Sequence, residues 1–331
     1  MDLSRRMMIA SGLMAATMPC AATARADDGV PSADKELRVP VTGGDLYLRV
    51  NGNLESGRPP LIMVHGGPGG ALWQLFPALP LSVDRAIILY DQLDSGRSDA
   101  PGDKANWTVD RYVSEIAAIR DALKLEAFHL YGHSWGGILA NRYASRRPAG
   151  LKSLILQGTP LSAARLDASV RSLYGALPNG VAAVIERNER AGTFDDPAYG
   201  EAMTAFMRKH LNRTSTRAVA MPYMASLPAD RGDALALAMT GGALAPFGGA
   251  LKDFNDENLL GEIAVPTLLL CGEFDIMTPT ATRAMLPLLK HGSFLEISGA
   301  GHMAQFDQPE TWRTAISNFL TASEGRDGLK Q

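Results

Sequence analysis

The sequence has no strong excess of either charge and little that marks a specialised surface. Its 331 residues include 32 Lys and Arg against 35 Asp and Glu, a net charge of -3. No Lys- or Arg-rich block is present, which argues against a nucleic acid partner. After residue 26, no apolar run reaches the roughly 18 residues of a membrane-spanning helix. His, Cys, Asp and Glu do not recur at metal-ligand spacing. We therefore predict a globular protein without a metal, a cofactor or stable membrane insertion.

The N-terminal stretch 1–26 predicts a cleaved export signal. Arg5-Arg6 precedes an apolar run from Met7 to Met18, and Ala24-Arg25-Ala26 forms a small-residue cleavage site. The paired arginines resemble the twin-arginine export motif, so the expected location is periplasmic or secreted. A general secretory signal, an N-terminal membrane anchor and lipidation at Cys20 remain open as alternatives.

Cysteine is scarce, with only Cys20 and Cys271 in the chain. Cleavage after Ala26 leaves Cys271 alone, and the exported protein is then expected to have no internal disulfide. Cys271 ends the apolar run 267–270, which indicates a small core residue rather than a reactive thiol.

Short apolar runs that stop at glycine or a polar residue recur along the chain. They cover residues 61–64, 86–90, 128–131, 154–156, 267–271 and 293–297, and the stretch 113–123 between two of them has helical spacing. Near-continuous apolar strands alternating with helices are typical of a parallel sheet buried on both faces. In such sheets the ligand crevice lies at the carboxyl ends of the strands. We therefore predict an α/β fold with a mostly parallel central sheet and helices on both faces.

Residues 161–254 have a different character. They are rich in Ala, Arg and Met, and their helical pattern is interrupted at prolines and glycines. We predict a helical cap over 161–254, inserted into a core formed by 27–160 and 255–331.

Gly132-His133-Ser134-Trp135-Gly136 is the most informative motif. This G-x-S-x-G pentapeptide follows the strand-like run 128–131 and precedes a helical segment. A sharp turn from strand to helix exposes the serine hydroxyl, and its glycines let the backbone pass closely. Ser134 is therefore the predicted nucleophile.

A serine nucleophile needs a base to accept its proton and a carboxylate to orient that base. In α/β-hydrolases the chain order is serine, acid, histidine. Asp275 follows the apolar run 267–271, and His302 follows the last run at 293–297. Both satisfy the order, although a helix-capping Asp275 and an exposed loop His302 are the simpler alternatives.

The oxyanion of the tetrahedral intermediate also needs donors. Backbone N–H groups aimed at it contribute on the order of 3 kcal/mol each. The residue after the nucleophile, Trp135, supplies one predicted donor, and Gly67 in the glycine loop 65–69 supplies the other. His65 is expected to stabilise that loop by hydrogen bonds, whereas His210 and His291 are expected at the surface.

Several motifs together resemble the proline iminopeptidase family of α/β-hydrolases. They are His65-Gly66-Gly67-Pro68-Gly69, Asp91-Gln92 with Gly96-Arg97-Ser98, Gly132-His133-Ser134-Trp135-Gly136-Gly137 and Gly301-His302. The resemblance covers most of the chain after the signal. It implies an α/β-hydrolase fold with a helical cap, a triad of Ser134, Asp275 and His302, and oxyanion donors at Gly67 and Trp135.

The substrate-binding positions depart from that family. Its aminopeptidases recognise the free amine with glutamates, one of which often follows the catalytic aspartate, where this chain has Ile276. A second glutamate corresponds loosely to Leu244. We assign Ile276, Leu244 and Trp73 to the substrate pocket. Acidic residues elsewhere in 161–254 could replace the glutamates: Glu186, Glu189, Asp195, Asp196 and Glu201.

Two hydrolase functions therefore compete. One is release of an N-terminal proline or amino acid amide through an acyl-enzyme. The other is a carboxylesterase or lactonase acting on an uncharged acyl group, because Ile276 and Leu244 cannot pair with an ammonium. A lyase on the same scaffold is a remote alternative. The expected partner is a small molecule or short peptide, and the sequence leaves the oligomeric state open.

Overall fold

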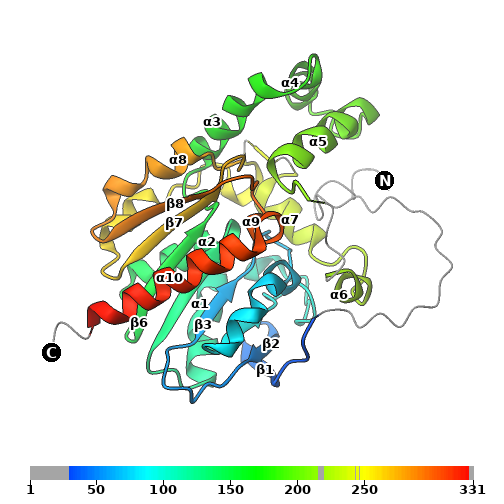
Figure 1. Cartoon of the computed structure of the whole chain (residues 1–331). Helices are drawn as coiled ribbons and strands as arrows, with labels where there is room; N and C mark the ends of the chain where they lie inside the picture. Colours follow the sequence, from blue (N-terminus) through cyan, green and yellow to red (C-terminus); the bar gives the residue numbers. More distant parts are fainter. Residues whose placement is uncertain (1–29, 215–219, 243, 246, 328–331) are drawn as a thin grey trace.

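The computed structural model describes residues 30–214, 220–242, 244–245 and 247–327 (Figure 1). The predicted export signal at 1–26 lies outside the described residues. The strands are β1 (Lys35–Val41), β2 (Gly44–Asn51), β3 (Leu61–Val64), β4 (Ile87–Tyr90), β5 (Phe128–His133), β6 (Leu151–Gln157), β7 (Thr267–Gly272) and β8 (Gly292–Ile297).

The helices alternate with these strands. The α-helices are α1 (Val109–Ala122), α2 (Trp135–Ser145), α3 (Ala163–Leu173), α4 (Val181–Ala191), α5 (Pro197–His210), α6 (Met221–Ala225), α7 (Asp233–Thr240), α8 (Pro279–Arg283), α9 (Ala304–Asp307) and α10 (Pro309–Asp327). The 3-10 helices are η2 (Leu72–Val83), η3 (Lys104–Asn106), η4 (Tyr174–Ala176), η6 (Gly249–Leu251), η7 (Glu257–Glu262) and η8 (Leu286–Leu288).

Among the described residues, the strands form one eight-stranded sheet in the order β1-β2-β4-β3-β5-β6-β7-β8. β1, β2 and β4 pair antiparallel, and the pairs from β4 to β8 are parallel. The prediction of a mostly parallel sheet is confirmed. Because β5, β6, β7 and β8 are parallel neighbours, the loops after β5, β7 and β8 emerge at the same edge of the sheet.

Each central strand is apolar on both sides because helices cover both faces of the sheet. In β3, Ile62 and Val64 join the core cluster that contains α1 and α2, whereas Leu61 and Met63 join the cluster that contains η2 and α10. Side chains alternate between faces in a strand, so two buried faces require a continuous apolar run. This is the physical reason for the apolar runs in the sequence. Cys271 of β7 is fully buried and belongs to this core, as predicted.

The helices α3 to η6 lie between β6 and β7 and are called the inserted helices below. The chain enters and leaves them at one place, where Ser162 and Asn255 form an isolated antiparallel bridge. The amide of Asp256 donates to the carbonyl of Leu161 at 2.7 Å on one side of this bridge. In Figure 1, α3, α4 and α5 extend beyond the carboxyl ends of the strands.

The backbone of the inserted helices closely approaches that of the glycine loop, at Gly232 and Gly69. A Cβ on Gly69 would lie 2.3 Å from the carbonyl oxygen of Gly232, and a Cβ on Gly232 would lie 2.2 Å from that of Gly69. Both residues also have positive φ, 81° and 88°. Glycine is therefore required on both sides of this contact.

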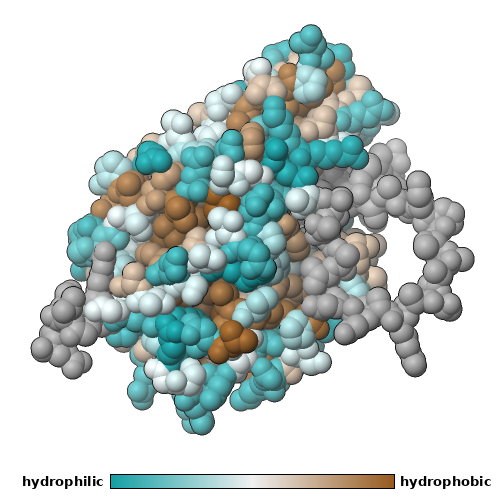
Figure 2. Space-filling model, viewed as in Figure 1, coloured by the Kyte–Doolittle hydropathy of each residue, from teal (hydrophilic) through white to brown (hydrophobic). Residues whose placement is uncertain are grey.

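The surface is mixed in polarity, as Figure 2 shows for one face. Apolar surface is visible over the edge strand β8, where the side chain of Leu295 is 39% exposed. No helix in the described part of the chain is long and apolar enough to cross a membrane.

Candidate active site

Ser134 lies at the turn between β5 and α2, with φ 53° and ψ -119°. This conformation is rare for a residue with a side chain and is typical of functional sites whose surroundings hold the strain. The backbone passes too closely for side chains on either side: a Cβ on Gly132 would lie 2.4 Å from the carbonyl oxygen of Gly136. The amide of Ser134 donates to the carbonyl of Gln157 at 2.8 Å. The sequence motif therefore folds into the expected elbow, with its serine partly exposed.

Asp275 and His302 meet at the same edge of the sheet. His302 Nδ1 lies 2.7 Å from Asp275 Oδ1, and both side chains are buried. The same carboxylate oxygen accepts the amide of Met277 at 2.9 Å. Because the carboxylate accepts, Nδ1 carries the imidazole proton and Nε2 is left as the basic nitrogen.

The imidazole of His302 lies beside the elbow. Its ring centroid is 4.7 Å from that of His133, the residue before Ser134. His133 Nε2 donates to the carbonyl of His302 at 3.1 Å. Gly158, at the end of β6, packs so closely that a Cβ there would lie 2.7 Å from His302 Nδ1. The structure thus pairs His302 with Asp275 and places the imidazole against the residue that precedes Ser134.

The glycine loop lies directly against the elbow. A Cβ on Gly66 would lie 3.3 Å from the Cβ of Ser134, and the amide of Gly66 donates to Gln74 Oε1 at 3.0 Å. The neighbouring Gly67 has φ 140° and precedes a cis peptide bond to Pro68. Trp135 begins α2, and the first amides of a helix have no intrahelical acceptor. The glycine loop that contains Gly67 and the first residue of α2, Trp135, therefore both lie next to Ser134.

Buried side chains fix this arrangement. His65 Nδ1 donates to the carbonyl of Gly66 at 2.8 Å, and its Nε2 accepts a hydrogen bond from the backbone N–H of Gln92 at 3.2 Å. His65 therefore stabilises the glycine loop, as predicted. Burial lowers the pKa of His65 to about 4, which keeps the ring neutral at pH 7. Trp135 Nε1 donates to Gln92 Oε1 at 2.8 Å, so Gln92 connects the elbow to His65 and the glycine loop.

Comparison with known proteins decides the family. The model of the alpha/beta hydrolase fold matches residues 59–309. A proline iminopeptidase of Heyndrickxia coagulans is 34% identical over 286 residues, which cover 86% of this chain and 98% of the relative. The proline iminopeptidase structure from Mycobacterium smegmatis superposes with a TM-score of 0.81 at 29% identity, covering 88% of this chain and 100% of that one.

The chain belongs to the proline iminopeptidase family of α/β-hydrolases. Another proline iminopeptidase, from Levilactobacillus brevis, is 32% identical over 293 residues and covers 88% of this chain and 97% of its own. The protein is therefore a hydrolase, and the serine type is typical of its family.

The predicted pocket residues of this α/β-hydrolase fall into two groups. Ile276 is buried directly after Asp275, and its carbonyl accepts a hydrogen bond from Ser169 of α3 at 2.6 Å. Leu244 is half-buried and packs against the same core cluster as Ile276. Trp73 belongs to the other cluster, where its ring lies 6.0 Å from that of Phe306.

Of the acidic residues suggested as replacements for the glutamates, Glu189 accepts a hydrogen bond from Tyr174 at 3.2 Å. Burial raises the pKa of Glu189, which disfavours its charged form.

His210 is the functional candidate that the sequence interpretation missed. It was expected at the surface but is only 2% exposed, at the end of α5 and against the triad loops. The spacing of Tyr199, Ala202, Phe206 and His210 places all four on one buried helix face. This helical periodicity in the sequence could have indicated that His210 is buried. His291 is exposed, as expected.

Buried glutamines form a second feature that the sequence did not reveal. Gln157 Nε2 donates to Gln305 Oε1 at 2.7 Å, and Gln305 Nε2 donates to the carbonyl of Gln74 at 3.2 Å. Gln74 in turn holds Gly66. These hydrogen-bonded side-chain amides connect the end of β6, the segment after His302 and the glycine loop.

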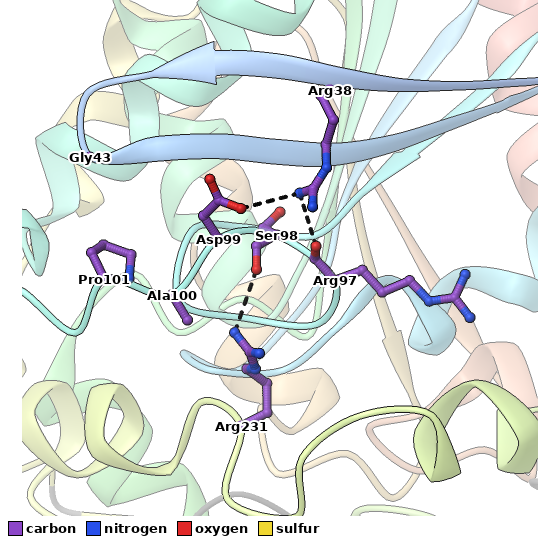
Figure 3. Close-up of a pocket in the computed structure, with 8 residues that line it drawn as sticks. All are labelled: Arg38, Gly43, Arg97, Ser98, Asp99, Ala100, Pro101 and Arg231. Carbon is purple, nitrogen blue, oxygen red and sulfur yellow. Dashed lines mark hydrogen bonds and ion pairs between the residues drawn. The ribbon is translucent and has the colours of Figure 1, made fainter.

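A separate surface pocket of about 530 Å³ lies between the core and the loop that joins α6 to α7 (Figure 3). Arg38 forms an ion pair with Asp99 at 3.6 Å, and Arg231 reaches the carbonyl of Ser98 at 3.5 Å. The Arg97 side chain points away from these two arginines. None of the predicted site residues lines this pocket. In the described part of the chain, no group of three or more His, Cys, Asp and Glu side chains could hold a metal ion.

Proposed function

We propose that this hydrolase cleaves a small amide or ester through an acyl-enzyme on Ser134, with His302 as general base and Asp275 as its orienting carboxylate. The observation that carries the proposal is the 2.7 Å contact between His302 Nδ1 and Asp275 Oδ1 beside the elbow serine. It fixes the tautomer that leaves Nε2 able to accept a proton.

The proposed reaction has two halves. Ser134 Oγ attacks the acyl carbon while its proton moves to His302 Nε2, and the oxyanion is held by the amides of Gly67 and Trp135. The imidazolium then protonates the leaving amine or alkoxide as its bond to the acyl carbon breaks. In the second half, water attacks the acyl carbon while one of its protons moves to His302 Nε2. The bond between the acyl carbon and Ser134 Oγ then breaks, His302 returns the proton to Oγ, and the acid is released.

For the substrate, the relatives favour release of an N-terminal proline or amino acid. Proteins named proline iminopeptidase match nearly their whole length to this chain. In this proposal the inserted helices cap the site, and a small molecule or short peptide is the ligand.

A second candidate is an ester or lactone with an uncharged acyl group. Ile276 favours it, because this buried apolar side chain directly follows Asp275 and cannot pair with an ammonium. Burying an unpaired ammonium costs several kcal/mol.

Parallel assays with proline p-nitroanilide, prolinamide and p-nitrophenyl acetate separate the two candidates. Cleavage of the two amine-bearing substrates supports the iminopeptidase. Turnover of the ester alone overturns it and supports the esterase. Inactivity toward all three, with no labelling by a fluorophosphonate, contradicts the serine hydrolase mechanism itself.

Replacement of the nucleophile tests the mechanism directly. Ser134→Ala is expected to abolish both turnover and fluorophosphonate labelling while the fold remains intact. Ser145→Ala is a matched control on the same helix α2, because the Ser145 hydroxyl donates only to a helical carbonyl, that of Arg142, at 2.9 Å. Near-normal activity of Ser134→Ala would show that another residue attacks.

We also propose that the protein is exported, with cleavage after Ala26. The charged start, apolar run and A-x-A site at 1–26 support this proposal. Cell fractionation and N-terminal sequencing test it. A cytoplasmic protein that begins before residue 26 would contradict it.

A further inference from the structure

His210 contacts both loops that carry the proposed acid and base. Its Nδ1 lies 2.8 Å from the carbonyl oxygen of Phe274, the residue before Asp275. Its own carbonyl accepts the amide of His302 at 2.9 Å. One residue at the end of α5 is therefore bonded to the neighbour of the acid through its side chain and to the base through its main chain.

The hydrogen bond between His210 Nδ1 and the Phe274 carbonyl can run in only one direction. A carbonyl can only accept, so Nδ1 of His210 is the protonated nitrogen. Burial lowers the pKa of His210, which favours the neutral ring. The ring also packs on Phe206, with centroids 4.9 Å apart, and this contact holds its orientation.

The residues after His210 strengthen the same connection. The carbonyl of Leu211 accepts the amide of Met303 at 2.8 Å. Arg213 Nε donates to the carbonyl of Gly299 at 3.1 Å, and its guanidinium lies 3.8 Å from the centroid of the Phe274 ring. Both triad loops are thus held against one segment, 210–213, that comes from the inserted helices.

We infer that His210 is a positioning residue, which sets the separation of Asp275 and His302 by holding the Phe274 carbonyl. The inference rests on the proposed function of the triad. Geometry matters at this level because a misplacement of about 1 Å in a catalytic group can cost on the order of 100-fold in rate.

Two substitutions, His210→Asn and His210→Gln, distinguish a donor held at the position of Nδ1 from a polar side chain of any geometry. Asn places its amide nitrogen near the position of the imidazole Nδ1, whereas Gln extends past it toward the position of Nε2. We expect His210→Asn to retain kcat within about threefold. His210→Gln and His210→Leu are expected to lose about 10- to 100-fold in kcat with KM changed less than twofold.

The assay is steady-state hydrolysis of p-nitrophenyl acetate together with the rate of fluorophosphonate labelling. His129→Leu is the matched control, because His129 is also fully buried but bonds Ser153 and Glu324, away from the triad. It is expected to lower the melting temperature and to leave kcat unchanged.

The outcomes are distinct. If His210→Asn and His210→Gln have equal kcat, the positioning role is wrong, even where His210→Leu fails to fold. If His129→Leu loses as much kcat as His210→Leu, the loss reflects stability, and the inference is overturned. Failure of the wild-type protein to label contradicts the proposed function instead.

Discussion

Removal of one carboxylate near the C-terminus should destabilise the protein in a pH-dependent way. Glu324 of α10 lies 2.5 Å from Arg85, which comes just before β4, and 2.8 Å from Arg58, which comes just before β3. His129 of β5 contacts the same carboxylate at 3.1 Å. The Arg85 side chain is only 2% exposed, and its other acidic partner, Asp84, lies further away at 3.4 Å.

The pKa of Glu324 gives the magnitude. Burial alone raises it, but the hydrogen bonds and charges of Arg85 and Arg58 outweigh burial and lower it from 4.5 to about 2. Such a shift stabilises the folded state by about 3 kcal/mol at pH 7. Since the folded-state pKa is lowered, the stabilisation is complete above pH 4.5 and is lost as the pH falls toward 2.

Glu324→Gln should therefore reduce the free energy of unfolding by about 3 kcal/mol or more at pH 7, because the buried Arg85 is also left with the more distant carboxylate of Asp84. Urea unfolding of both proteins from pH 7 to pH 3 is the assay. The difference between them should shrink by about 2 kcal/mol between pH 7 and pH 3. Repeating the comparison in a His129→Leu background removes the titration of that neighbour. A difference that stays constant with pH refutes the reasoning.

Three further substitutions test the site. Gly158→Ala should lower kcat/KM at least 100-fold, because the new methyl group lies 2.7 Å from His302 Nδ1. Gly175→Ala is its control, because no atom lies within 4 Å of the added Cβ. Ile276→Glu should shift the ratio of prolinamide to ester turnover toward the amine-bearing substrate, and an unchanged ratio would place amine recognition elsewhere. Trp135→Phe should cost about 1–3 kcal/mol in urea unfolding, because it leaves the carboxamide oxygen of a buried glutamine unpaired; an unchanged midpoint would contradict this.

The sheet could be predicted because its signals are local. Each strand that is covered on both faces must be apolar throughout, and each ends at a glycine or polar residue. The placement of Ser134, Asp275 and His302 at one edge then follows from parallel neighbours, with no knowledge of side-chain packing.

The contacts of the inserted helices could not be predicted in this way. The burial of His210 depends on how the end of α5 meets loops about 65 and 90 residues further along the chain. Glu324 meets Arg58 and Arg85 across more than 230 residues. Such contacts are set by tertiary packing, and a single sequence carries only their weak helical periodicity.

The backbone contact between Gly69 and Gly232 has a consequence for recombining members of this family. A chimera that takes its inserted helices from one relative and its core from another joins the two halves of this contact from different parents. Because neither side has room for a Cβ, a single alanine contributed by one parent would push the glycine loop away from the elbow. Such chimeras should therefore be selected for glycine at both positions before any substrate-binding residue is considered.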